Sequence, residues 1–118
     1  FLPKVFPNKK LKFNSWTNDS KLVKNKYNIM ESNSEKFILI DKLDFLLIPF
    51  VGVDMNGRRL GYGGGYYDRA LEKILSSSSE KEIVGMGYEY QILEDAFGEM
   101  HDIKYDIVFS ENNIHRFR

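Results

Sequence analysis

The chain has 118 residues, no cysteine, and 17 basic against 17 acidic residues, so its formal net charge is zero. That length suits one domain with a modest core, and 42% hydrophobic with 29% charged residues is typical of a globular protein. The lack of cysteine excludes disulfides and thiolate sites. Because no apolar stretch reaches membrane-spanning length and no signal peptide is visible after Phe1, we expect a cytoplasmic protein.

Basic residues are concentrated near the N-terminus, where Asp19 is the only acid up to residue 26. A nucleic-acid-binding module would use these lysines for phosphate contacts, with Phe13 and Trp16 as stacking surfaces. The alternative is a solvated face beside a site for an anionic small molecule. No recognised nucleic-acid motif accompanies the lysines, so a nucleic-acid partner is only the alternative reading. The basic residues of this N-terminal region are Lys4, Lys9, Lys10, Lys12, Lys21, Lys24 and Lys26.

The first half of the chain predicts strands separated by a polar region. Residues 2–6 and 10–13 have strand-like composition. Residues 17–36 are polar and predict an irregular loop with at most a short turn. The apolar run 42–51 has the length and composition of a strand buried on both faces. Pro49 should end this strand, because proline cannot donate to a ladder.

The second half predicts one helix and two further strands. Apolar residues recur at helical spacing over 66–75, and the runs 82–87 and 107–109 suit strands. The order strand, glycine segment, helix, strand predicts a βαβ unit with a right-handed crossover. We therefore expect a single α/β domain over residues 1–118. Its mostly parallel sheet should be flanked by helices in a Rossmann-like three-layer arrangement.

Five of the nine glycines lie between residues 57 and 65, beside arginines, tyrosines and an aspartate. Glycine lets successive backbone N–H groups turn inward and form an anion-binding concavity. The segment lacks the lysine and hydroxyl of a P-loop, and Tyr66 stands where a dinucleotide fingerprint has its third glycine. The residues alone therefore predict an anion site, which a nucleotide would suit, or a glycine-rich turn without a ligand.

The string 57–69, Gly-Arg-Arg-Leu-Gly-Tyr-Gly-Gly-Gly-Tyr-Tyr-Asp-Arg, closely resembles the signature of the 5-formyltetrahydrofolate cyclo-ligase family, also called methenyltetrahydrofolate synthetases. A Leu-Leu-Ile-Pro strand and the pair Val53 and Asp54 precede it. The similarity continues through Gly-Met-Gly-Tyr-Glu-Tyr-Gln at 85–91 and His-Asp-Ile-Lys-Tyr-Asp at 101–106. The resemblance thus spans nearly the whole chain.

The resemblance implies conversion of 5-formyltetrahydrofolate to 5,10-methenyltetrahydrofolate, with ATP and Mg²⁺ as cofactors and ADP and phosphate as products. The formyl oxygen is a poor leaving group, so the γ-phosphoryl is transferred onto it, N10 attacks the activated carbon, and phosphate departs. Such an enzyme positions two substrates and spreads phosphoryl charge rather than supplying a nucleophile.

The family's functional residues carry over by position in the motif. Arg59 matches the catalytic arginine, whose guanidinium suits multidentate phosphate contacts. The segment implied to wrap ATP is Arg59, Leu60, Gly61, Tyr62, Gly63, Gly64, Gly65, Tyr66 and Tyr67. The residues implied to contact the folate are Tyr27, Tyr62, Gly63, Gly64, Gly65 and Tyr66. Asp68 and Asp102 match the magnesium-associated carboxylates, a ligand type that Mg²⁺ prefers.

Several of these residues also have structural readings. Asp68 begins the predicted helix, where free N–H groups and the helix dipole stabilise a carboxylate without metal. Tyr67 begins the apolar stripe and suits the core, while Asp102 alone would pass for a loop acid. His101 is read as structural, because phosphoryl transfer to a carbonyl oxygen needs no base. Gln91 either contacts a ligand or closes a strand end.

The chain also departs from the family pattern. Members carry an N-terminal helical stretch with a basic ATP-contacting element and a folate-contacting glutamate, and we expect this chain to begin after both. In the aromatic-Gly-Ile-x-Glu-Pro pattern, Tyr27 and Glu31 are retained while Asn28 and Ser32 differ, and Gly64 stands where many members have lysine. A shortened relative that binds nucleotide or folate without catalysis is therefore an alternative. Besides ATP and the folate, the expected partners are a missing N-terminal segment or a second copy.

Overall fold

The computed structural model describes residues 1–60, 66–75, 81–98 and 103–117, with the backbone alone for Asp68 and for 72–75. Their elements are β1 (Leu2–Phe6), β2 (Lys10–Asn14), β3 (Leu22–Lys24), β4 (Met30–Ser32), β5 (Phe37–Ile38), β6 (Phe45–Leu47), β7 (Gly52–Val53), β8 (Arg59–Leu60), α1 (Tyr66–Leu75), β9 (Glu82–Met86), β10 (Ile107–Phe109) and β11 (Ile114–Arg116). Three 3-10 turns complete them: η1 (Pro7–Lys9), η2 (Ile40–Lys42) and η3 (Glu89–Gln91).

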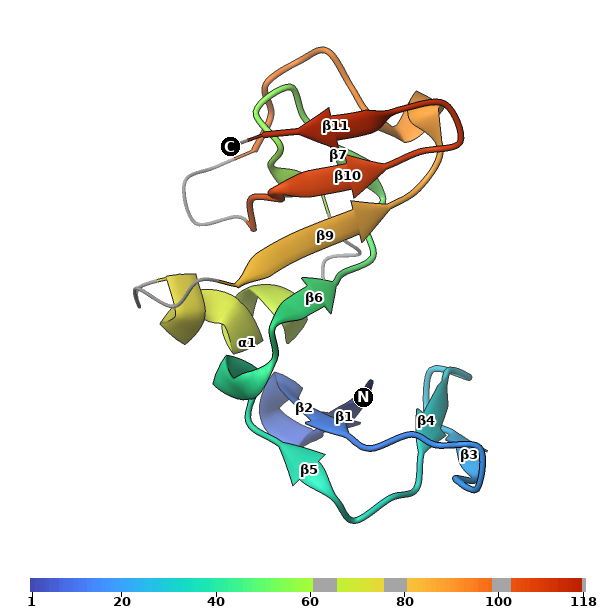
Figure 1. The fold of residues 1–118 in the computed structure, drawn as a ribbon. Coiled ribbons are helices and arrows are strands. Elements are labelled where there is room, and N and C mark those ends of the chain that lie inside the picture. The colour runs from blue at the N-terminus through green and yellow to red at the C-terminus, as the bar shows by residue number, and fades with distance from the viewer. Residues whose placement is uncertain (61–65, 76–80, 99–102, 118) are drawn as a thin grey trace.

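The main sheet has the strand order β11-β10-β9-β6 and is partly parallel (Figure 1). β9 runs parallel to β6 and β10, whereas β11 is antiparallel to β10. The helix α1 lies in the connection from β6 to β9, which confirms the predicted βαβ unit, and β6 ends before Pro49 as expected. The described residues contain one α-helix, so they do not provide the helical layers predicted for both faces of the sheet.

A smaller antiparallel sheet, β1-β2-β5, lies across α1 from the main sheet (Figure 1). The polar region predicted as an irregular loop instead contains a hairpin of β3 and β4. The turn of this hairpin is built by Asn25, whose Oδ1 accepts the N–H groups of Tyr27 and Ile29. Side-chain acceptance of this kind favours turns, and it explains why a polar sequence forms paired strands here.

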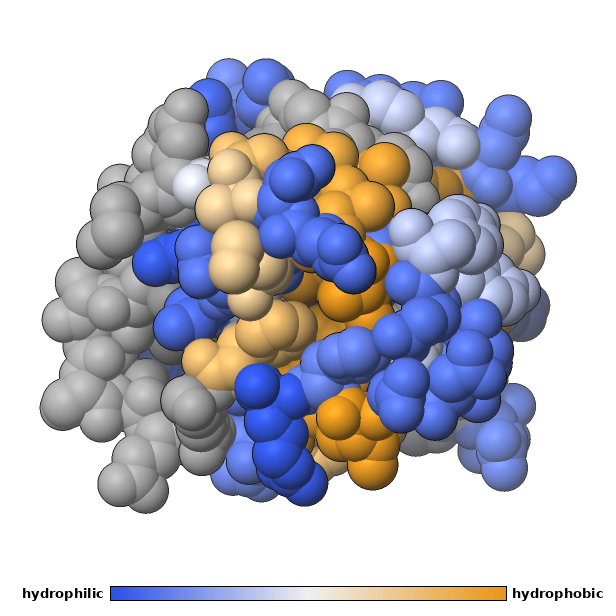
Figure 2. Space-filling model, turned by 90° about the horizontal axis from the view of Figure 1, so that it is seen from above, coloured by the Kyte–Doolittle hydropathy of each residue, from blue (hydrophilic) through white to orange (hydrophobic). Residues whose placement is uncertain are grey.

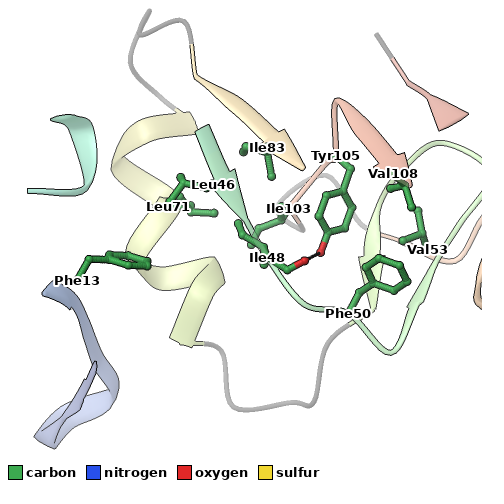
Figure 3. Packing of buried hydrophobic residues seen from close by; sticks show 10 residues of the cluster. All are labelled: Phe13, Leu46, Ile48, Phe50, Val53, Leu71, Ile83, Ile103, Tyr105 and Val108. Atoms are coloured by element: carbon green, nitrogen blue, oxygen red, sulfur yellow. Dashed lines mark hydrogen bonds between the residues drawn. The ribbon is translucent and has the colours of Figure 1, made fainter. Parts of the chain in front are cut away.

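The core lies between α1, β2 and one face of the main sheet (Figure 3). Tyr105 is fully buried there, and its hydroxyl donates a hydrogen bond of 2.8 Å to the carbonyl of Ile48. Gly85 makes room for this ring and for Phe50, since a Cβ at Gly85 would meet the two rings at 2.9 to 3.0 Å. The cluster comprises Phe13, Leu46, Ile48, Phe50, Val53, Leu71, Ile83, Ile103, Tyr105 and Val108.

The other face of the main sheet is uncovered by the described residues. Phe45 is 67% exposed, Leu47 57% and Met86 63%, although Leu46 between the first two is buried. The expectation that the run 42–51 is a strand buried on both faces is therefore wrong for β6. The reason is that α1 covers only the face carrying Leu46, while parallel strands normally have both faces covered.

Apolar side chains also gather at the centre of the face seen from above, with hydrophilic residues along its right side (Figure 2). Apolar side chains therefore lie on the molecular surface as well as in the core cluster. Among the described residues no helix combines the length and the apolar character needed to cross a bilayer.

We expect the exposed sheet face to drive self-association of this chain, because contiguous apolar surface favours burial against a second copy. Replacing both Leu47 and Met86 by lysine should reduce association, since a buried unpaired charge is strongly unfavourable. Sedimentation velocity over a concentration series measures the effect. Val23→Lys on the exposed strand β3 is the matched control and should associate like the wild type. A wild-type chain that stays monomeric throughout would contradict the expectation.

Candidate functional site

Arg59 begins β8, directly after the tight turn that joins β7 to β8, and is in register with Val53. Gly57 adopts a φ of +82° in this turn, a conformation that favours glycine. The turn is closed by bonds between Asp54 and Arg58 and between Gly57 and Asp54, both 3.0 Å long. A rigid turn of this kind fixes where the Arg59 side chain begins.

The Arg59 side chain is 8% exposed and is held at the end of β6. Its Nε donates a 2.6 Å hydrogen bond to the carbonyl of Pro49, which follows β6. The guanidinium carbon lies 5.5 Å from the centre of the Tyr67 ring, on α1. The structure thus brings the predicted arginine to the carboxyl end of a parallel strand, where ligands bind in such sheets.

Tyr67 packs against the core cluster, in agreement with the structural reading of this residue. Burial raises the pKa of its phenol, while the positive charge of Arg59 acts in the opposite direction and only reduces the rise. The ring therefore remains neutral at ordinary pH and supports the guanidinium by cation–π contact. Tyr67 therefore supports the position of the Arg59 guanidinium.

Tyr27 and Tyr66, two predicted folate contacts, meet although 39 residues separate them. Their hydroxyls lie 3.0 Å apart, and their rings cross at 79°. The shared hydrogen bond lowers the pKa of Tyr27 and raises that of Tyr66. Lys26 adds a cation 5.1 Å from the centre of the Tyr27 ring. The contact attaches the β3–β4 hairpin to the first turn of α1.

Glu31 on strand β4 ties this hairpin to strand β1 and to its own turn. Its carboxylate is nearly buried and accepts hydrogen bonds from the Val5 N–H at 2.8 Å and from the Asn25 side chain at 3.0 Å. The same Asn25 forms the turn that carries Tyr27. A cavity lies beside it, lined by Val5, Phe6, Pro7, Asn25, Lys26 and Glu31. The glutamate of the family pattern therefore has a structural task in this chain, which is to hold the Tyr27 turn.

The buried carboxylate of Asp54 accepts four backbone N–H groups, a feature that sequence reasoning missed. Oδ1 accepts those of Asn56 and Arg58, both at 2.8 Å, and Oδ2 accepts those of Phe97 at 3.2 Å and Gly98 at 2.8 Å. Desolvation, the largest single influence, raises the pKa of Asp54, but the four amides together lower it below its ordinary value of 3.8. The sequence Asp-Met-Asn-Gly was a visible signal, since aspartate commonly accepts bonds from the turn it begins.

Gln91 closes the end of β9. Its Nε2 donates to the carbonyl of Val51 at 3.1 Å and its Oε1 accepts the N–H of Tyr88 at 2.8 Å. Gly87 allows this approach, because a Cβ there would meet the Phe50 ring and the Gln91 side chain. The sequence left open whether Gln91 contacts a ligand or closes a strand end. The two hydrogen bonds of its side chain agree with the second role.

The remaining predicted site residues lie outside the described part of the chain. These are Gly61, Tyr62, Gly63, Gly64, Gly65, His101 and Asp102. The backbone of Asp68 lies in the first turn of α1, and the assignment of Asp68 and Asp102 to Mg²⁺ stays a prediction. Within the described residues no three acidic or histidine side chains lie together as a metal site. Leu60 is exposed beside Arg59.

Known proteins with similar sequences share one family. The model of the 5-formyltetrahydrofolate cyclo-ligase family matches residues 1–111. The 5-formyltetrahydrofolate cyclo-ligase of Haemophilus influenzae is 34% identical over 107 residues, covering 87% of this chain and 56% of that protein. The one from Escherichia coli strain K12 is 31% identical over 106 residues, covering 88% and 57%.

A solved structure with a similar fold belongs to a protein of the same kind. The NMR structure of Aquifex aeolicus 5,10-methenyltetrahydrofolate synthetase superposes with a TM-score of 0.80 at 30% identity. The match covers 98% of this chain and 57% of that one. The chain therefore spans little more than half the length of the relatives it matches.

Acid should destabilise the fold through Asp54. Because its folded-state pKa is depressed, the stability it contributes is fully present above pH 3.8 and is lost as the pH falls through the folded-state pKa. Asp54→Asn lacks this contribution, so the gap in melting temperature between wild type and variant should shrink from pH 7 to pH 3. Circular dichroism melts measure the gap, and Asp19→Asn on the exposed surface should show none. A gap for Asp54→Asn that is constant with pH would count against the assignment.

Proposed function

This chain belongs to the 5-formyltetrahydrofolate cyclo-ligase family, and on that premise we propose that it serves the ATP-dependent conversion of 5-formyltetrahydrofolate to 5,10-methenyltetrahydrofolate. The observation that carries the proposal is the fixed, nearly buried guanidinium of Arg59 at the carboxyl end of β6, and in the sequence Arg59 lies shortly before the glycines at 61 and 63–65. A positioned cation next to a run of glycines suits the phosphates of ATP.

Arg59 acts by holding phosphoryl charge in a set place. Phosphoryl transfer depends on positioning and on electrostatic stabilisation of the transferred group, with little covalent work for the protein. The bond to Pro49 and the Tyr67 ring hold the guanidinium in one place, so little reorganisation is needed when charge develops. Residues 59–67 are the proposed backbone wrap around the phosphates.

Mg²⁺ is part of the proposal through Asp68 and Asp102, the carboxylates at the family's metal positions. Oxygen ligands on two separate segments suit Mg²⁺, which binds one or two carboxylates together with waters and substrate phosphates. When bound, the ion neutralises phosphate charge. The chain's own residues orient the phosphates and exclude water.

The folate is proposed to lie against Tyr27 and Tyr66. Their bonded hydroxyls present two aromatic rings from different elements, and Lys26 stands next to them. Aromatic rings offer flat apolar surface for a heterocycle. Since Tyr66 also ends the glycine segment, a folate bound there would lie beside the proposed phosphates.

The Rossmann-like three-layer arrangement belongs to the same proposal. It requires a helical layer on the exposed face of the main sheet, next to Phe45 and Leu47. The relatives carry enough additional length for such a layer, since the match covers 56% to 57% of them. The alternative is a shortened, non-catalytic relative that binds nucleotide or folate without turnover.

Arg59→Ala should lower the affinity for Mg·ATP by roughly tenfold or more, because a charge-assisted hydrogen bond contributes about 1.5–3 kcal/mol. Isothermal titration of the chain with Mg·ATP measures it. The matched control is Arg116→Ala on the exposed strand β11, which should bind like the wild type. The absorbance of the methenyl product tests turnover in the same samples after adding 5-formyltetrahydrofolate. Equal ATP affinity in Arg59→Ala and wild type would refute the assignment, and heat only with RNA would favour the nucleic-acid reading.

Tyr27→Phe should weaken binding of 5-formyltetrahydrofolate by a few-fold and leave Mg·ATP binding unchanged. The reason is that loss of one hydroxyl removes a hydrogen bond worth about 1 kcal/mol and releases the Tyr66 partner. Tyr90→Phe, which alters a tyrosine exposed elsewhere, is the control. Titration with each ligand separates the outcomes. A loss of ATP affinity instead of folate affinity would contradict the placement of the folate.

A further inference from the structure

We propose that Asp54 is a positioning residue of the nucleotide site, whose carboxylate fastens the Arg59 turn to the segment that leads into residues 99–102. This inference rests on the proposed function, because it concerns the residues that function assigns to ATP and Mg²⁺. Asp54 touches neither ligand in this account. It acts through Arg59 on one side and through residues 97–98 on the other.

The two oxygens of Asp54 serve two different segments. Oδ1 takes both of its N–H groups from the arginine turn, at Asn56 and Arg58. Oδ2 takes both of its N–H groups from Phe97 and Gly98. One buried side chain therefore makes four bonds that join segments more than 40 residues apart.

The far end of the 99–102 interval is fixed to the same turn. The Arg59 N–H donates to the carbonyl of Ile103 at 2.8 Å, and the Tyr105 N–H donates to the carbonyl of Gly57 at 2.8 Å. The chain thus enters the interval from Gly98 and leaves it at Ile103 with both ends bonded to the arginine turn. Asp102, the proposed metal carboxylate, belongs to this interval in the sequence. The described residues on both sides of the interval, Gly98 and Ile103, are therefore bonded to one turn or to its aspartate.

A carboxylate is required at this position, and an amide would not replace it. An ionised carboxylate has acceptors on both oxygens, whereas asparagine has one oxygen and one NH₂ group that only donates. Either orientation of asparagine would point donors at two of the four N–H groups, in a site that is 0% exposed. Gly98 completes the fit, because a Cβ there would overlap the Arg58 side chain and lie 2.9 Å from Oδ2.

The test is a double-mutant cycle between Asp54→Asn and Arg59→Lys, read as Mg·ATP affinity by isothermal titration of the whole chain. Lysine keeps a positive charge but loses the Nε bond to Pro49. If Asp54 acts through Arg59, Asp54→Asn alone should weaken Mg·ATP binding by roughly tenfold, as a displaced catalytic group does. In the Arg59→Lys background the same change should cost about twofold or less, because coupled residues are not additive.

Asp106→Asn is the matched control. Asp106 also accepts a backbone N–H, that of Ile83 at 2.8 Å, but this donor belongs to β9 and not to the arginine turn. Its substitution should lower the melting temperature without weakening Mg·ATP binding. Hydrogen exchange provides a second readout: in Asp54→Asn, the N–H groups of Arg58, Arg59, Phe97 and Gly98 should exchange faster while those of β9 keep their protection.

The outcomes separate this inference from the function on which it rests. If the wild type binds Mg·ATP and Asp54→Asn binds equally well, or loses the same factor in both backgrounds, Asp54 is only structural and the inference is overturned. If the wild type itself does not bind Mg·ATP, the proposed function fails for this chain and the inference falls with it. Weakened, non-additive binding together with faster exchange at both segments supports the inference.

Discussion

The hydrogen bond from Arg59 to the carbonyl of Pro49 joins the start of strand β8 to the end of strand β6, where the nucleotide is proposed to bind. It fixes a cation to the end of β6, the strand that begins the βαβ unit. The same guanidinium lies over Tyr67 in the first turn of α1, so strand, turn and helix meet at one side chain. An exposed arginine would lose considerable side-chain entropy on binding phosphate, whereas this one is already ordered.

Buried polar groups hold the turns of the proposed site, in addition to the support that the Tyr67 ring gives to Arg59. Asp54 and Glu31 are both buried carboxylates that accept backbone N–H groups, and each holds a turn that carries a predicted ligand contact. Buried carboxylates are unfavourable unless their acceptors are satisfied, so such groups mark places where the backbone path has to be definite. Here those places are the turns of Arg59 and Tyr27.

Local sequence signals predicted the regular elements well. Strand β1 at Leu2–Phe6, helix α1 at Tyr66–Leu75 and strand β10 at Ile107–Phe109 lie where composition and periodicity indicated. The hairpin β3–β4 was missed because its strands are held by Asn25 and Glu31, whose acceptor roles composition does not reveal. Burial of β6 on both faces was wrong because a hydrophobic run reports what a strand prefers, and not whether anything covers it.

The site was only partly predictable for a similar reason. Arg59, Tyr27 and Tyr66 were found through the family motif, and the structure brings the two tyrosines into contact. The four bonds of Asp54 join positions 54 and 98, a distance along the chain that periodicity cannot span. Long-range bonds of this kind follow from the fold, so they become visible only in three dimensions. The exposed face of the main sheet is a further such feature.

The central claim, that Arg59 is held ready for the phosphates of ATP, is tested most directly by nuclear magnetic resonance of ¹⁵N-labelled chain titrated with Mg·ATP. The account predicts that the largest shifts occur at the Arg59 Nε–H and at the N–H groups of Gly57, Arg58 and Gly98. Shifts confined to the lysines of the N-terminal region, with Arg59 unchanged, would contradict it.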